Sequence, residues 1–312
     1  MKNSSFLFTG IFGAMAFMIS GAAPAQAQSA PGIINAVGVE SAYADVISQV
    51  GGVYVRVTAI ETAPNTDPHT FEVSPKVARQ IAAADLIVEN GAGYDGWADR
   101  MIAASPSAAR RVINVQHLRG LPEGTQNPHL WYDPATMPAV AKALVADFSA
   151  LQPAHAAYFQ ANENAFEESL KPWFAAIAAF EKDFGGTPVA VTEPVGDYLL
   201  TAMGARIVTP FSLQAAIMNG TDPSPQDVST QNTLLTGHNV KVLVYNQQVT
   251  NPLTQSFLAL ARKSGIPVVA VYETMPTPGY TYQSWMLAEV SALRDAVADK
   301  KSTETLLQGT PR

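Results

Sequence analysis

Short apolar runs alternate with amphipathic segments through the first half of the chain. The runs Leu86-Ile87-Val88 and Val112-Ile113 are continuous, which is typical of strands covered on both faces. Strands that alternate with helices of ~10–15 residues indicate βαβ units and a parallel sheet. The expected strands are residues 34–39, 53–60, 85–89 and 111–115, and the expected helices are residues 41–50, 75–84, 94–104 and 133–151.

Two of these helices carry a start signal. Ser74 precedes Pro75, and Asp133 precedes Pro134. A short polar side chain followed by proline is typical of a helix N-terminus, because the side chain can accept a backbone hydrogen bond and proline needs none. We therefore expect Ser74 and Asp133 to be N-caps.

Residues 154–184 have a different pattern. This segment contains no glycine and one internal proline, Pro172, and its aromatic and aliphatic residues recur at roughly helical spacing. Gly185-Gly186 follows it and provides a helix end. The pattern predicts one long helix, which is a stiffer connection than a Gly/Ser linker.

The second half then repeats the strand–helix alternation. The expected strands are residues 188–192, 206–209, 240–245 and 267–271, and the expected helices are residues 195–203, 224–238, 252–264 and 280–298. Residues 300–312 show no pattern and are expected to be frayed. The chain therefore predicts an α/β fold: two (β/α) lobes with parallel sheets, residues 28–153 and 186–312, joined by a long rigid backbone helix at residues 154–185.

The first 27 residues indicate export rather than folding. Lys2 gives a positive start, an apolar run covers residues 6–19, and Ala25-Gln26-Ala27 is an A-x-A cleavage signal. The run is shorter than the ~20 residues that span a bilayer. We expect a secretory signal peptide, a periplasmic location and no membrane anchor.

Charge and cysteine content narrow the possible functions. The net charge is −7, and no Lys/Arg stripe is present that could neutralise phosphates, which argues against nucleic acid as a partner. The chain has no cysteine, which excludes disulfides and thiolate metal ligands. We expect a protein that is stable on its own core and monomeric.

Four side chains are candidate metal ligands: His69, His129, Glu193 and Glu273. Three of them follow shortly after an expected strand, and His129 ends the loop after residues 111–115. In open parallel sheets, ligands bind beyond the carboxyl ends of the strands. Taken alone, a loop histidine is more often a solvated or capping residue, and a glutamate after a strand is more often a helix-end charge or a salt-bridge partner. The repeated Pro-His pair and the strand-end positions together favour a site for Zn, Mn, Fe or Ni.

At these residues the chain resembles the TroA/ZnuA-like family (cluster A-I) of metal-binding solute-binding proteins, which serve ABC importers of zinc or manganese. The resemblance extends over nearly all of the chain after the signal peptide. The segments that carry it are residues 67–72 (DPHTFE), 83–91 (AADLIVENG), 127–134 (NPHLWYDP), the long connector, Glu193 five residues before Tyr198, and 265–271 followed by Glu273.

The resemblance implies a function and a ligand set. Such proteins hold one ion between two lobes and pass it to a membrane permease, and they are not enzymes. Residue by residue, His69, His129 and Glu193 match the first three ligands. Glu273 stands where the family usually has aspartate, and Asp197 is the fallback for this position.

The ligand types also bear on the metal. Zinc-type members usually have histidine in the third position and often a histidine-rich loop before the second histidine. Here the third position is Glu193, and the loop at residues 117–127 is short, with one histidine. Two carboxylates favour Mn²⁺ or Fe²⁺, with Zn²⁺ as the alternative.

Two other functions fit the same residues. A periplasmic metal-dependent hydrolase would use Glu273 as general base on a metal-bound water. Four ligand-like side chains leave no open coordination position, which weighs against it. An organic-ligand binder on the same fold is the second alternative.

Overall fold

The computed structural model describes residues 1, 32–276 and 278–307. Apart from Met1, the predicted signal peptide lies outside these residues. Residues 32–312 belong to one compact unit. Among the described residues, none of the helices combines the length and the apolar character needed to cross a membrane.

The first sheet has four parallel strands in the order β2-β1-β3-β4. In its register, Val37 lies between Thr58 and Ile87. Strand β3 is buried at every position, as its continuous apolar run predicts. The same prediction is wrong for Val112 of β4, which is 42% exposed on the edge strand of this sheet. The strands are β1 Ile34–Glu40, β2 Val55–Glu61, β3 Leu86–Glu89 and β4 Arg111–Asn114, and the helices are α1 Ser41–Gly51, α2 Pro75–Ala82, α3 Gly96–Ala104, α4 Val115–Leu118 and α5 Thr136–Leu151.

The second sheet repeats this topology with the order β6-β5-β7-β8, again all parallel. The predicted α/β fold with two parallel sheets is therefore confirmed. The strands are β5 Pro188–Val191, β6 Arg206–Ile207, β7 Val242–Asn246 and β8 Val268–Val271, and the helices are α7 Asp197–Ala202, α8 Phe211–Met218, α9 Pro225–Thr236, α10 Pro252–Lys263 and α11 Tyr282–Asp299.

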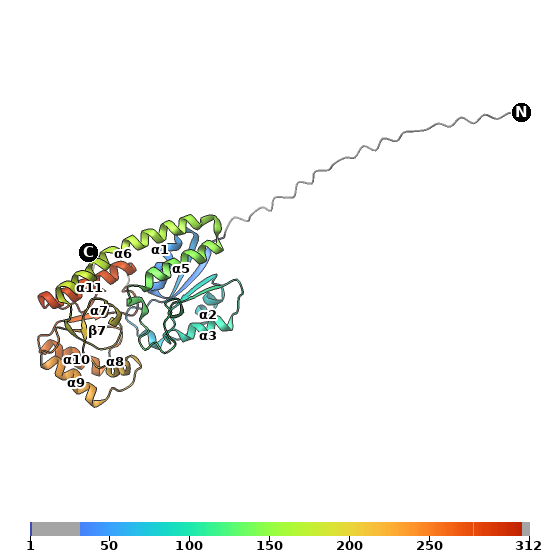
Figure 1. Ribbon diagram of the computed structural model, residues 1–312. Coiled ribbons are helices and arrows are strands. Elements are labelled where there is room, and N and C mark those ends of the chain that lie inside the picture. The colour runs from blue at the N-terminus through green and yellow to red at the C-terminus, as the bar shows by residue number, and fades with distance from the viewer. Residues whose placement is uncertain (2–31, 277, 308–312) are drawn as a thin grey trace. The chain divides into compact units, whose positions relative to one another are not determined.

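Helix α6, Ala156–Phe184, is the predicted long helix (Figure 1). It packs on α1 and α5 beside the first sheet and on α11 beside the second. Trp173 is fully buried and meets the Tyr282 ring edge-on, with 5.8 Å between centroids. One apolar stripe on this helix thus contributes to the cores around both sheets. Its buried residues include Phe159, Phe166, Leu170, Trp173, Ile177 and Phe180.

The two predicted N-caps have different outcomes. Ser74 accepts a hydrogen bond from the Val77 N–H at 3.3 Å and caps α2, as predicted. Asp133 does not cap α5, which begins only at Thr136. Its side chain instead accepts from the Ala135 N–H at 2.9 Å, and this local turn competes with helix formation.

Two further differences concern segments without a regular pattern. Helix α8 was not predicted, because its sequence, FSLQAAIM, is apolar on almost every side and shows no helical period. Residues 300–307 are not frayed: Thr303 pairs with Val269 of β8, and Leu306 is buried. Residues 308–312 lie outside the described part of the chain.

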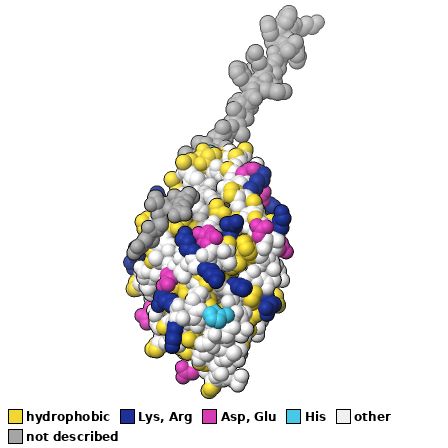
Figure 2. Space-filling model, turned by 90° about the vertical axis from the view of Figure 1, so that its left-hand side faces the viewer, with side chains coloured by type: hydrophobic (Ala, Val, Ile, Leu, Met, Phe, Trp, Pro, Cys, Tyr) yellow, Lys and Arg dark blue, Asp and Glu magenta, His cyan; other side chains and the backbone are white. Residues whose placement is uncertain are grey.

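Eight acidic side chains are buried, which changes the meaning of the net charge. Burial raises the pKa of both Glu61 and Glu289 to about 8, so these groups are largely protonated at neutral pH. The surface is accordingly less acidic than the sequence, and Lys and Arg side chains are spread over the face shown in Figure 2. The buried acids are Glu40, Glu61, Glu89, Asp95, Glu163, Glu193, Glu273 and Glu289.

Candidate metal centre

The predicted ligands lie where the strands of both sheets end. His69 lies in the short 3-10 helix Pro68–Thr70 after β2, and the Asp67 side chain accepts its backbone N–H at 2.8 Å. Glu193 follows β5, and Glu273 follows β8. His129 immediately precedes the 3-10 helix Leu130–Tyr132. His69, Glu193 and Glu273 thus follow strands, as the pattern predicted, and His129 ends the loop after β4.

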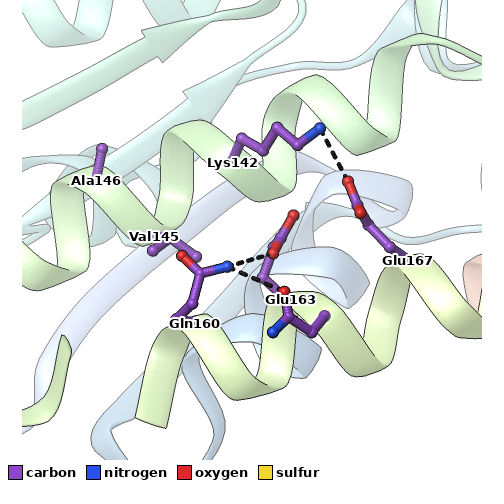
Figure 3. A pocket seen from close by; sticks show the side chains of 7 residues that line it. Lys142, Val145, Ala146, Gln160, Glu163 and Glu167 are labelled. Carbon is purple, nitrogen blue, oxygen red and sulfur yellow. Dashed lines mark hydrogen bonds and ion pairs between the residues drawn. The ribbon is translucent and has the colours of Figure 1, made fainter. Parts of the chain in front are cut away.

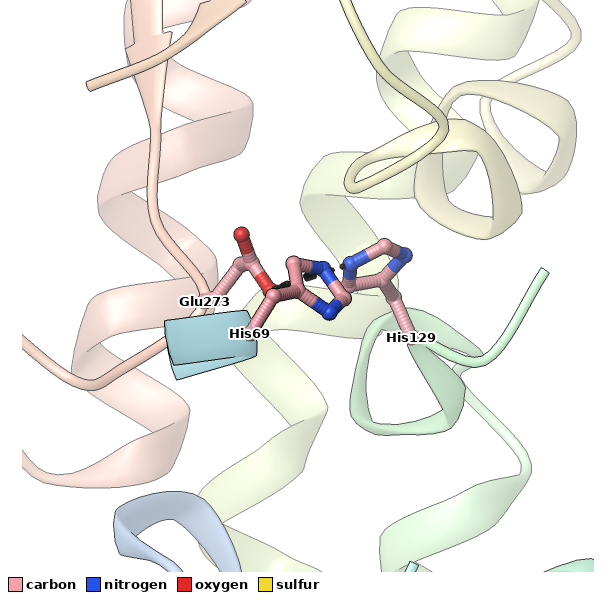
Figure 4. A group of neighbouring side chains, drawn as sticks. All are labelled: His69, His129 and Glu273. Carbon is pink, nitrogen blue, oxygen red and sulfur yellow. Dashed lines mark hydrogen bonds and ion pairs between the residues drawn. The ribbon is translucent and has the colours of Figure 1, made fainter. Parts of the chain in front are cut away.

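Three of the four side chains converge (Figure 4). The Glu273 Oε2 atom lies 3.4 Å from His69 Nε2 and 3.3 Å from His129 Nε2. One ligand atom from each residue lies within 4.8 Å of the others. The side chains of His129 and Glu273 are fully buried, whereas a quarter of the His69 side chain is exposed.

The hydrogen bonds of Asn127 determine which nitrogen of His129 carries a proton. Asn127 Oδ1 accepts the His129 backbone N–H at 3.0 Å and lies 2.8 Å from His129 Nδ1. Asn127 Nδ2 donates to the Pro194 carbonyl at 2.8 Å, which fixes the amide orientation. Since Oδ1 can only accept, Nδ1 is protonated. Burial lowers the pKa of His129, so the neutral ring presents the Nε2 lone pair to Glu273.

The Glu273 carboxyl group is held as an anion. Its Oε2 accepts the Tyr94 hydroxyl at 2.9 Å, and its Oε1 accepts Asn246 Nδ2 at 2.6 Å. Burial alone would raise its pKa, but the interactions with His129, the charge of His69 and the Tyr94 hydroxyl together lower it. An anion facing two imidazole nitrogens is an arrangement that favours a cation between them.

Glu193 is close to this group but is not a member of it. Its Oε2 accepts Asn246 Nδ2 at 2.6 Å, so one amide group donates to both Glu193 and Glu273. The Glu193 Oε1 atom is buried and has no hydrogen-bond partner among the described residues. Burial, followed by repulsion from Glu273, raises the pKa of Glu193 well above its usual value. Asn246 therefore separates the fourth predicted ligand from the other three.

Sequence reasoning missed the residues that support the ligands: Tyr94, Asn127, Asn246 and Gln248. Asn246 is the last residue of β7, between β5 and β8, so the strand-end rule could have identified it. Gln248 accepts the Glu273 backbone N–H at 2.6 Å. Asn127 belongs to the same NPH motif as His129, whereas no sequence signal marks Tyr94.

The remaining candidates lie outside the convergent group. Asp197 starts α7, and burial raises its pKa to about 7. His117 pairs with Glu123 at 3.2 Å, and both side chains are more than half exposed. These residues offer no third ligand atom nearby among the described residues.

Two cavities adjoin His69. One has a volume of about 510 Å³ and extends toward Gln248 and Asn251, and the other has a volume of about 380 Å³ and extends toward Tyr94. Met218 and Asn219, at the end of α8, line both. The exposed edge of His69 is therefore the accessible side of the three-residue group.

A separate cavity of about 460 Å³ lies between α5 and α6 (Figure 3). Most of its polar groups pair with one another: Lys142 pairs with Glu167 at 3.0 Å, and Gln160 donates to Glu163 at 2.6 Å. Glu163 Oε1 is buried without a partner among the described residues. It contains no histidine. The arrangement provides no convergent ligand set comparable to the one at Glu273.

Comparisons with known proteins agree on one family. Residues 39–296 match the family model described as ZnuA, zinc-uptake complex component A periplasmic. The manganese-binding lipoprotein MntA of Bacillus subtilis is 26% identical over 137 residues, which are 42% of this chain and 44% of MntA. The chain spans about half the length of the curated relatives it matches.

Solved structures extend the likeness over most of the chain. The solute-binding protein FpvC of Pseudomonas aeruginosa, solved with Mn²⁺, is 21% identical, with a TM-score of 0.69 over 86% of this chain and 99% of FpvC. A crystal structure of ZnuA is 19% identical, with a TM-score of 0.70 over 85% of this chain and 100% of that one. At these identities the likeness concerns the fold.

Proposed function

The chain belongs to the ZnuA family of periplasmic zinc-uptake components, and on this premise we propose that it captures a divalent transition-metal ion for an ABC importer. The observation that carries the proposal is the convergence of His69, His129 and Glu273, with one ligand atom of each within 4.8 Å of the others. Two imidazoles and a carboxylate suit first-row divalent ions. The ion would replace the direct contacts between Glu273 and the two rings.

Glu193 is the proposed fourth ligand. Its unpartnered Oε1 is buried beside the group, and its other oxygen shares the Asn246 amide with Glu273. Glu273 is proposed as a ligand rather than a general base, because its Oε2 lies within 3.4 Å of both histidine nitrogens. A hydrolase would need that carboxylate to face a water instead.

Manganese or iron is the proposed cargo, ahead of zinc. Two carboxylates make a harder ligand set than three imidazoles, which shifts the preference toward Mn²⁺ and Fe²⁺. MntA, a relative of this chain, is a manganese-binding protein by name. Delivery to a membrane permease from the periplasm, by a monomeric protein, completes the proposal.

Metal titration of the purified protein, taken from residue 28 onward, tests this function. The protein is analysed for bound elements as purified, stripped with a chelator, and titrated with Mn²⁺, Fe²⁺ and Zn²⁺ in competition. We expect one ion per chain. A stripped, folded protein that takes up none of the three ions would rule the function out.

Changing Glu193 to histidine should shift the metal preference toward zinc. A third imidazole softens the ligand set, so the affinity ratio of Zn²⁺ to Mn²⁺ should rise by about tenfold, or ~1.4 kcal/mol. Competitive titration measures this ratio. The control is Glu168→His on the exposed side of α6. An unchanged ratio in Glu193→His would argue against Glu193 as a ligand.

Changing Asn127 to alanine should weaken metal binding without removing a ligand. The variant loses the acceptor that holds the proton of His129 on Nδ1. Loss of such a supporting partner typically lowers metal affinity by about 10- to 100-fold. Asn164→Ala, which removes an exposed amide on α6, is the matched control. Equal Mn²⁺ affinities in the two variants would contradict the assigned role of Asn127.

A further inference from the structure

Residues 302–307 continue the second sheet beyond β8. The Thr303 N–H donates to the Val268 carbonyl and the Ala270 N–H to the Thr303 carbonyl, both at 2.9 Å. Ser302 Oγ accepts the Val268 N–H at 3.0 Å. These bonds satisfy the outer edge of β8. This C-terminal segment, residues 302–307, is therefore paired at its start with the strand that leads to Glu273.

Side chains fix the C-terminal segment in addition to the backbone. Arg262 of α10 pairs with Glu304, with 3.1 Å between Nε and Oε1. The Tyr245 hydroxyl donates to the Glu304 carbonyl at 3.2 Å. Leu306 is 7% exposed and packs in the core. The segment thus has defined neighbours on β7, β8 and α10.

Tyr272 connects the C-terminal segment to the metal centre. Its hydroxyl accepts the Leu306 N–H at 2.8 Å, lies 3.1 Å from Thr305 Oγ1 and donates to Gln247. Its backbone is held from the other side: its carbonyl accepts the Tyr132 hydroxyl at 2.9 Å. Tyr272 is fully buried and directly precedes Glu273.

We propose that the C-terminal segment and Tyr272 position the Glu273 carboxylate for metal binding. Tyr272 is then a positioning residue, because it acts on the ion only through Glu273. The C-terminal segment holds the hydroxyl of Tyr272, and Tyr132 holds its backbone carbonyl. Glu273, the next residue, therefore has little conformational freedom. A ligand whose support is loosened spends less time in the binding geometry. This inference rests on the proposed metal-binding function.

Tyr272→Phe in the full chain tests the link, because it keeps the buried ring and removes only the hydroxyl. We expect Mn²⁺ affinity to fall by about tenfold, in the range found for residues that support metal ligands. Tyr158→Phe is the matched control, since the Tyr158 hydroxyl on α6 accepts only the Val53 N–H, at 3.4 Å, among the described residues. Its Mn²⁺ affinity should remain that of the unchanged protein.

A shortened chain that ends at Lys301, and so lacks the C-terminal segment, provides the second part of the test. If Tyr272 acts through the segment, its hydroxyl loses most of its effect once the segment is gone, because only the bond to Gln247 remains. Tyr272→Phe should then change Mn²⁺ affinity by less than about twofold in the shortened chain, a non-additivity that general destabilisation would not produce. All titrations are made where circular dichroism shows the variants to be folded.

The outcomes separate this inference from the function on which it rests. If the full chain binds Mn²⁺ and Tyr272→Phe binds it equally well, the positioning role is overturned and the function stands. Equal losses from Tyr272→Phe in the full and shortened chains would also overturn it. If the unchanged protein binds none of Mn²⁺, Fe²⁺ and Zn²⁺, both proposals fail together.

Discussion

Glu273→Gln is expected to reduce divalent-metal affinity by at least about 100-fold, which exceeds the usual effect of changing a supporting residue. The Glu273 Oε2 atom is the one atom that both histidine nitrogens face. Glutamine keeps the shape and can still accept from Asn246 or Tyr94, so the fold should survive. The change removes the negative charge at the point where the ion would sit. Isothermal titration with Mn²⁺ and Zn²⁺ measures the loss.

The surface pair formed by His117 and Glu123 supplies the matched control. It has the same chemistry at a similar distance, 3.2 Å, but both side chains are largely exposed. Glu123→Gln should leave metal affinity unchanged. If Glu273→Gln bound metal as tightly as Glu123→Gln, the convergence of the three side chains would have no functional meaning.

The metal-free protein is expected to lose stability as the pH rises from about 5 to 8. Buried acids at the ends of β1, β2 and β3 drive this effect together with Asp95, which precedes α3: Glu40, Glu61, Glu89 and Asp95. Burial raises the pKa of Glu61 and Glu89 to about 8 and that of Asp95 to about 6, and it raises the pKa of Glu40 well above its usual value.

The sign follows from where the protons are bound. Between the ordinary carboxyl pKa and the raised one, the folded state holds protons that the unfolded state has released, so unfolding becomes easier as the pH rises. Burial lowers the pKa of His129, and this acts in the opposite direction below its ordinary pKa of 6.5. The acids with raised pKa values outnumber it, because Glu193, Asp197 and Glu289 add to these four. We expect a loss on the order of 2–5 kcal/mol, measured by urea unfolding at pH 5 and pH 8.

Glu40→Gln should reduce this pH dependence. Both Glu40 carboxyl oxygens are buried without a donor among the described residues, and Asp95 and Glu61 are its charged neighbours. A neutral amide should make the protein more stable at pH 8 and change little at pH 5. Glu168→Gln, at an exposed position on α6, should leave the profile as it is. A flat profile in the unchanged protein would refute the explanation.

The fold was largely predictable because its signals are local. Continuous apolar runs marked the buried strands, and the carboxyl ends of parallel strands meet on one side of each sheet. This is why His69 and Glu273, 204 residues apart in sequence, both lie beyond strand ends; His129, at the end of the loop after β4, converges with them. That Glu193 binds the ion with them remains a prediction.

The missed features depend on distant partners. Thr303 is ordered by its pairing with Val269 of β8. Nothing in the sequence of residues 300–307 indicates that they pair with the edge of the second sheet. Helix α8 lacks a polar face, so periodicity could not reveal it. The role of Asn246 as a shared donor depends on the spacing of β5, β7 and β8, which composition does not encode.

The packing of α6 on both halves has a consequence for affinity. The imidazoles come from the first half of the chain and the carboxylates from the second, so neither half alone carries the full set of proposed ligands. Helix α6 contacts α1 and α5 from the first half of the chain and α11 from the second. It acts as a short tether that gives each set of ligands a high effective concentration around the other. An arriving ion then loses mainly its own translational freedom and water shell, since the two halves have already been brought together by folding.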